Sequence, residues 1–344
     1  MTMMRSAHVA GIGRVAVVSR PRPAPGPGQA LMALTYGGIC GSDTHAVAGH
    51  HPLLTPPDYY PGHEATGRIE ELGAGVEGWE VGQRIILKPN VVCGECVNCR
   101  AGRTNACQTL AWIGCDVTNR WPGAMAECFI APASNLFAVP DSIDDQTAAL
   151  VECLSTPVHA VRIAGDISGD GVVVIGGGTI GLFSVIAARL AGAGRIVVTD
   201  LDPAKLERAR RHGADVAVDA AAGDADAQVA EALGGPADLV FDCVANEASI
   251  RQALGLLRHA GKIMVVGVPP RDFQVPMPYV QDWEMTIQGC ASYTAEDIDA
   301  SIAIAARGEV PTSEIISRVY QLERAPEAFA EAAQSSSGKV LIQP

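Results

Sequence analysis

The hydrophobic residues of this chain follow two patterns, and the change between them falls near residue 171. Before it, short apolar runs such as 30–34 and 82–87 are separated by Gly- and Pro-rich turns, which predicts an irregular, mainly β region. From Gly171 onward, buried apolar runs alternate with longer stretches of helical periodicity. Because alternating strands and helices form parallel sheets, the second region is predicted to be α/β.

The predicted elements follow this alternation. After Pro140, an alanine-rich helical stretch through residue 164 leads into the second region. The expected strands are 172–175, 195–199, 238–242 and 262–266, and the expected helices include 180–191 and 203–212. The last apolar run, 339–342, has no partner in this alternation, so we expect that strand to return to the first region.

Length and charge narrow the class of protein. A chain of 344 residues with 48% hydrophobic residues can build two domains with separate cores. Its net charge of -13 argues against nucleic-acid binding, which depends on Lys and Arg neutralising phosphates. Residues 1–10 show no signal-peptide or membrane-span pattern. We therefore expect a cytoplasmic protein that acts on a small molecule, with no nucleic-acid and no membrane partner.

A glycine-rich loop lies between strand 172–175 and the helix that follows. Its residues are Gly176, Gly178, Thr179, Ile180 and Gly181. In this context the glycines allow a tight turn, a close approach of backbone to a pyrophosphate and close helix packing, and the helix N-terminus holds the negative charge. The loop predicts a dinucleotide site. The alternative is a glycine-rich turn that only packs.

An acidic residue stands where the adenosine ribose of a dinucleotide is expected. Asp200 ends the next strand, nineteen residues after Gly181. A carboxylate there accepts hydrogen bonds from ribose hydroxyls and repels a 2′-phosphate, which favours NAD over NADP. Asp200 can also be read as a helix cap, and the nearby Lys205 leaves the strictness of the NAD preference open.

Four of the ten cysteines crowd into one loop, at Cys93, Cys96, Cys99 and Cys107. Four thiolates around one tetrahedral ion form a closed, structural zinc site, and the crowding favours metal over disulfides in a chain of this size. An iron–sulfur cluster is the competing interpretation, because four thiolates also hold clusters. A zinc-ribbon module for nucleic acid lacks the basic surroundings that it needs.

Further metal donors are dispersed along the chain. They are Cys40, the pair His63 and Glu64, and Glu152. One thiolate, one imidazole and one carboxylate with water form an open, catalytic zinc site. Each residue also has an ordinary explanation, as a buried thiol, a turn histidine or a carboxylate near a helix, so spacing alone leaves both interpretations open.

These motifs occur in the order typical of zinc-containing medium-chain dehydrogenases, which the chain resembles over essentially its whole length. The segments that carry the resemblance are 38–43, 62–64, the cysteine loop, 123–127 and the glycine-rich loop. It implies a Rossmann domain at 149–287 and a mainly β, GroES-like catalytic domain formed by 1–148 and 288–344. Residues 151–155 are similar to the sorbitol dehydrogenase branch, and 99–104 and 267–270 to the threonine dehydrogenase branch.

The resemblance also assigns the metal ligands. Cys40, His63 and Glu64 become ligands of a catalytic zinc, with Glu152 as a fourth or water-bridged ligand, which makes two Zn²⁺ per chain. Which glutamate binds directly stays open. A set of Cys40, His63 and Cys153 is a minor alternative.

A proton relay and cofactor contacts follow from the same resemblance. Ser42 and His45 would pass a proton to solvent, unless Ser42 only caps a helix and His45 is a surface residue. Asp43 would orient His63. Contacts to the nicotinamide half of the cofactor are implied by alignment alone for Thr156, Val266, Gly267, Val268, Cys290 and Ala291.

The implied reaction is reversible oxidation of a secondary alcohol to a ketone by NAD, in a homodimer or homotetramer. A polyol or vicinal diol is the first choice, with a threonine-type amino alcohol or a cyclic alcohol as alternatives. A different class would be an NAD-binding or quinone-reducing relative that is no alcohol dehydrogenase. The pocket is expected within 45–60, 112–121 and 290–296. Its polar candidates are His50, His51, Tyr59, Asn119 and Arg120, and its apolar walls Trp112, Trp121 and Tyr293.

Overall fold

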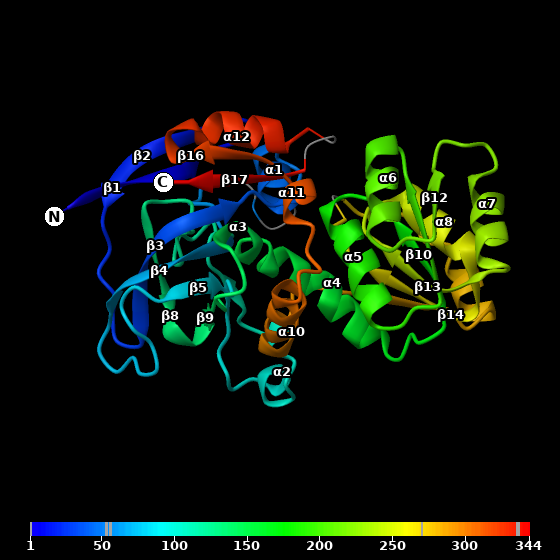
Figure 1. The fold of residues 1–344 in the computed structure, drawn as a ribbon, viewed down its shortest axis with the longest axis horizontal. Coiled ribbons are helices and arrows are strands. Elements are labelled where there is room, and N and C mark those ends of the chain that lie inside the picture. Colours follow the sequence, from blue (N-terminus) through cyan, green and yellow to red (C-terminus); the bar gives the residue numbers. More distant parts are fainter. Residues whose placement is uncertain (1, 52–53, 55–56, 270, 335–337) are drawn as a thin grey trace. The chain divides into compact units, whose positions relative to one another are not determined.

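The computed structural model describes residues 2–51, 54, 57–269, 271–334 and 338–344. The chain forms two compact units, which we call unit 1 (Met1–Cys153 and Tyr293–Pro344) and unit 2 (Leu154–Ser292) (Figure 1). Both crossings lie five residues later than expected, after 153 instead of 148 and after 292 instead of 287. Glu152 and Tyr293, which lie at the two crossings, are joined by a side-chain hydrogen bond within unit 1.

Unit 2 contains a six-stranded parallel sheet in the order β12-β11-β10-β13-β14-β15. Its strands are β10 (Gly171–Ile175), β11 (Arg195–Asp200), β12 (Val216–Asp219), β13 (Ala237–Asp242), β14 (Leu257–Val265) and β15 (Thr286–Gly289). Its helices are α5 (Thr179–Leu190), α6 (Pro203–Arg211), α7 (Ala225–Leu233), α8 (Glu247–Leu256) and α9 (Met277–Asp282), and α4 (Val151–Ala164) leads into the unit. This strand order is that of a doubly wound dinucleotide-binding fold, which confirms the α/β prediction.

Both faces of this sheet are buried, and this explains the uninterrupted apolar runs. Successive side chains of a strand point to opposite faces. Val172 and Val174 of β10 accordingly pack in one core cluster, and Val173 and Ile175 in the other. An apolar residue is therefore required at every position.

Unit 1 is built on a mainly antiparallel seven-stranded sheet, in which β16-β17-β3-β4-β5-β9 are neighbours and β8 also pairs with β3. These strands are β3 (Gln29–Gly38), β4 (Glu64–Leu72), β5 (Arg84–Leu87), β8 (Cys128–Pro132), β9 (Leu136–Ala138), β16 (Ile316–Gln321) and β17 (Lys339–Gln343). Two further pairs are β1 (Met3–Val9) with β2 (Val15–Pro21), and β6 (Asn90–Val91) with β7 (Ala111–Trp112). Because β17 pairs with β3, the prediction that the last strand returns to the first region is confirmed.

The helices of unit 1 are short except one. They are α1 (Gly41–Val47), α2 (Val97–Arg100), α3 (Asp145–Ala148), α10 (Ala295–Ala306), α11 (Thr312–Ile315) and α12 (Ala325–Ala332). The alanine-rich stretch predicted after Pro140 is thus divided, with α3 in unit 1 and α4 after it. Across the described ranges of both units, no helix has the length and apolar character needed to span a membrane.

Candidate zinc and dinucleotide sites

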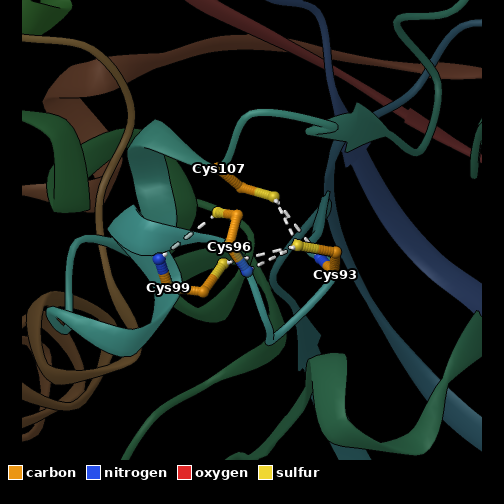
Figure 2. A group of neighbouring side chains, drawn as sticks. All are labelled: Cys93, Cys96, Cys99 and Cys107. Carbon is orange, nitrogen blue, oxygen red and sulfur yellow. Dashed lines mark hydrogen bonds between the residues drawn. The ribbon is translucent and has the colours of Figure 1, made fainter.

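The four cysteines of the loop point their sulfur atoms toward one common centre (Figure 2). The sulfur of Cys93 lies 3.5 Å from that of Cys107 and 4.0 Å from that of Cys99. Sulfur atoms bound to one tetrahedral zinc at ~2.3 Å are about 3.8 Å apart, so the spacing fits a single ion. The same distances are too long for disulfides, and they favour one ion over a cluster, whose thiolates sit on several iron atoms.

The backbone of this loop prepares the thiols for a metal. The N–H of Cys96 donates to the sulfur of Cys93, and the N–H of Cys99 to that of Cys96, both at 3.4 Å. Backbone N–H groups of Glu95 and Cys96 lower the pKa of Cys93 to about 6, whereas burial raises the pKa of Cys99. N–H groups aimed at sulfur stabilise the thiolate, which is the form that binds metal.

A second donor set forms where β3 ends and β4 begins. The register pairs Gly38 with Glu64, and α1 starts directly after Cys40, so that donor atoms of Cys40, His63 and Glu64 all lie within 4.8 Å of one another. A side chain at position 38 would collide with the Glu64 carboxylate at 2.2 Å, which explains that glycine. Three protein ligands of these types fit an open zinc site with room for a further ligand.

Two groups face His63 Nδ1. The sulfur of Cys115 is 3.6 Å away and Asp43 Oδ2 is 3.9 Å away. Desolvation lowers the pKa of buried His63, but Cys115, Asp43 and Cys40 more than offset it, so this pKa lies well above its usual value. An environment that favours positive charge on an imidazole also attracts a cation. Asp43 thus lies beside His63, and its orienting role stays a prediction.

The two glutamates have different partners. Glu64 forms a buried ion pair with Lys339, whose Nζ is 2.7 Å from each carboxylate oxygen. Glu152 accepts a hydrogen bond from the Tyr293 hydroxyl, and burial together with Glu64 raises the Glu152 pKa to about 7. Neither Glu152 nor Cys153 comes within 4.8 Å of all three donors of the set. Burial also keeps the Cys153 pKa far above its usual value.

The two relay candidates lie on α1. The Ser42 hydroxyl is buried and has no hydrogen-bond partner among the described residues, so the interpretation of Ser42 as a helix cap is wrong. The helix is capped instead by Cys40, whose backbone N–H donates to Asp43. His45 is exposed in the last turn, and partial desolvation and His50 lower its pKa.

The pocket candidates behave differently from one another. Trp112 presents its ring edgewise to His63, with centroids 6.1 Å apart. Tyr293 is no apolar wall, because its hydroxyl is bound to Glu152. Tyr59 and Asn119 are structural in these contacts, since Tyr59 donates to Asp43 and Asn119 bonds backbone groups of Asp58 and Tyr60. Residues 52, 53, 55 and 56 of the expected pocket lie outside the described residues.

The predicted dinucleotide residues gather at one edge of the parallel sheet. The glycine-rich loop follows β10, Asp200 ends β11, Val266–Val268 follow β14, and Cys290 with Ala291 follows β15. Carboxyl ends of parallel strands share one edge, which is where ligands bind in such folds. The Cys290 thiol is 3.8 Å from the carbonyl oxygen of Thr156, so Thr156 of α4 lies near this edge too.

Asp200 is attached to the glycine-rich loop. Its carboxylate accepts hydrogen bonds from the N–H of Gly177 at 2.6 Å and of Asp202 at 2.8 Å. A side chain at Gly177 would contact both Asp200 and Lys205. Asp200 and Lys205 therefore both lie beside Gly177 of the loop.

A dinucleotide-type sheet and an open metal-donor set in one chain define a class of metal-dependent dehydrogenases. The family descriptions "Alcohol dehydrogenase GroES-like domain" and "Zinc-binding dehydrogenase" match residues 26–141 and 179–307. The chain belongs to this family of zinc-binding dehydrogenases with a GroES-like domain, as predicted. The predicted fold class and enzyme class are confirmed, and the family description agrees with the prediction of zinc. Two similar solved structures contain NADP and NADH.

Relatives match nearly the whole chain. It is 31% identical over 339 residues to sorbitol dehydrogenase of Halalkalibacterium halodurans, with 97% of each covered. It is 32% identical over 311 residues to L-galactonate-5-dehydrogenase of Escherichia coli, with 90% of this chain and 89% of the relative covered. A Sinorhizobium meliloti structure solved with NADP bound is 30% identical, with a TM-score of 0.91 over 100% of both chains.

Proposed function

We propose that this chain oxidises a secondary alcohol to a ketone, reversibly, with zinc and NAD. The observation that carries the proposal is the convergence of Cys40, His63 and Glu64 into one donor set that leaves room for a substrate oxygen. Bound zinc lowers the pKa of an alcohol hydroxyl, and bound NAD accepts hydride from the carbon that carries it. The four cysteines of the loop would hold a second, structural zinc.

The side chains around this donor set give each ligand a fixed position. Lys339 neutralises Glu64 and holds its carboxylate, while Asp43 and Cys115 face His63 from its Nδ1 side. Glu152 lies outside the closest set, and we infer that it contacts the metal through water. With a pKa raised to about 7, Glu152 can accept or donate a proton near neutral pH.

We expect Ser42 and His45 to carry the substrate proton to solvent, because the Ser42 hydroxyl is buried and unpartnered among the described residues and His45 is exposed on the same helix. Ser42→Ala should lower kcat by about 100-fold with unchanged zinc content, since positioned proton transfer contributes roughly that much. Thr44→Val is the matched control, because the Thr44 hydroxyl bonds the Gly41 carbonyl instead. Equal kcat values for the two variants would rule out the relay.

The substrate class that we propose is a polyol or vicinal diol. Support comes from the names of the sorbitol and L-galactonate relatives. Trp112 beside His63 would supply a flat wall, and the Glu152 carboxylate would supply a partner for a hydroxyl group. The test measures NADH formation across polyols, diols, threonine and cyclic alcohols, together with zinc per chain. Turnover of threonine alone would overturn the polyol choice. No turnover with one zinc per chain would instead support the alternative class of NAD-binding or quinone-reducing proteins.

Replacement by alanine should have different effects at Gly178 and Gly181, two glycines of the glycine-rich loop. A side-chain carbon at Gly178 meets nothing within 4 Å, whereas one at Gly181 would lie 1.7 Å from the Gly176 carbonyl oxygen. We expect Gly178→Ala to fold normally and raise the KM for NAD at least about tenfold, because only the pyrophosphate would collide. Gly181→Ala should lower the melting temperature. A normal KM for NAD in folded Gly178→Ala would contradict the assignment of this loop.

The preference for NAD is expected to depend on Asp200. Asp200→Asn keeps a side-chain acceptor for the Gly177 N–H but removes the charge that repels a 2′-phosphate. The ratio of kcat/KM for NAD to that for NADP should fall about tenfold or more. Asp202→Asn is the control, because Asp202 caps α6. An unchanged ratio in Asp200→Asn would remove the basis for the NAD preference.

We further propose a cytoplasmic homodimer or homotetramer. The support is the family to which the chain belongs. Light scattering of the purified protein measures the assembly, and a monomeric mass at working concentration would overturn that part.

A further inference from the structure

A fully buried phenol lies behind the proposed catalytic donor set. The side chain of Tyr59 is 0% exposed, and its hydroxyl donates a hydrogen bond to Asp43 Oδ1 at 3.0 Å. Asp43 is also 0% exposed. Burial raises the pKa of this carboxyl group, while His63, the Cys40 N–H and the Tyr59 hydroxyl oppose that rise. The phenol is therefore one of three groups that stabilise the buried carboxylate against the effect of burial.

The other oxygen of the same carboxylate reaches two proposed zinc ligands. Asp43 Oδ2 accepts a hydrogen bond from the backbone N–H of Cys40 at 3.2 Å and lies 3.9 Å from His63 Nδ1. One carboxylate thus links a phenol, the backbone of the thiol ligand and the ring of the imidazole ligand. Groups that orient metal ligands in this way affect metal affinity by about 10- to 100-fold.

The fold holds the Tyr59 ring independently of its hydroxyl. Tyr59 exchanges two backbone hydrogen bonds with Val9, at 2.9 and 3.1 Å, and its ring packs in the apolar core around Ala46 and Met125. Phenylalanine at this position would keep the backbone pairing and the ring packing. What it would lose is the donor to Asp43.

We propose that Tyr59 is a positioning residue of the catalytic metal site, acting through Asp43 on Cys40 and His63. The inference rests on the proposed function, since it presupposes zinc at the Cys40 set. Without the phenol, one buried oxygen of Asp43 loses its hydrogen-bond donor, so the carboxylate is held less firmly in its orientation toward both ligands. We therefore expect the Cys40 set to bind its metal ion less tightly, while the fold is retained.

The test compares Tyr59→Phe with Tyr60→Phe, the adjacent tyrosine, whose ring stacks on His8 instead. In Tyr59→Phe we expect one of the two zinc ions to be lost to a chelator about tenfold faster, and the visible d–d spectrum of the Co²⁺-substituted protein to shift. Tyr60→Phe should match the wild type in both. In the background of Asp43→Asn, the Tyr59→Phe change should add little, because the partner that transmits it is altered.

The outcomes separate this proposal from the proposed function. If the wild type holds two zinc ions and Tyr59→Phe matches Tyr60→Phe in zinc release and spectrum, the role of Tyr59 is overturned and the zinc mechanism stands. Additive effects of Tyr59→Phe and Asp43→Asn would likewise overturn the path through Asp43. If the wild type holds zinc only at the four cysteines, the zinc mechanism fails and this proposal fails with it.

Discussion

Cys40→Ser should leave one zinc per chain and lower kcat/KM by at least about 1,000-fold. Cys40 supplies the only thiolate of the proposed catalytic set, and its loss leaves an imidazole and a carboxylate that is already paired with Lys339. Lewis-acid activation of the alcohol contributes several kcal/mol, which corresponds to about this factor. Metal analysis with steady-state kinetics measures both quantities.

A buried cysteine outside both donor sets provides the control. Cys128 is 0% exposed and belongs to the same unit, with its thiol near Met4. Cys128→Ser should keep two zinc ions and most of the activity, although it can lower stability. Full activity of Cys40→Ser after chelation and dialysis would show that the zinc mechanism is wrong.

The sequence predicts the fold correctly wherever the local hydrophobic pattern matches the burial of the residues in the folded protein. The run at β10 is apolar at every position because both faces of its sheet are covered, and the glycine-rich loop must turn directly after it. The return of β17 to β3 was inferred because an apolar run had no partner in the alternating region. The exact crossings between the units cannot be predicted from the sequence, since they depend on tertiary contacts along the whole chain.

The candidate sites divide in the same way. The four-cysteine loop is local, and its spacing alone predicts its geometry. The Cys40 set depends on the register between β3 and β4, which no local pattern specifies. Its three residues can therefore be grouped from the sequence only through the resemblance to a known family. Lys339 is 275 residues from Glu64, and no sequence signal pairs them. Tyr59 was considered only as a polar substrate contact, because its burial against Asp43 is a tertiary property.

Cys107→Ser should remove the other zinc and reduce stability while sparing the chemistry. The Cys107 sulfur contacts both the backbone N–H and the sulfur of Cys93 at the start of the loop. The loop also contains the short helix α2. With little apolar core of its own, such a loop depends on the metal for its fold. A loss of about 3 kcal/mol would lower the melting temperature by roughly 4 °C in a chain of this size.

The measurement for this variant combines zinc content, calorimetry and activity per folded molecule at low temperature. We expect one zinc, a lower melting temperature and kcat within about threefold of the wild type, because the Cys40 set does not include any residue of this loop. Cys128→Ser again serves as the control for loss of a thiol. Two results for Cys107→Ser would contradict the division into a structural and a catalytic site. One is retention of both zinc ions, and the other is a kcat as low as that of Cys40→Ser. In the second case, loss of the loop zinc would affect the chemistry as well as the stability.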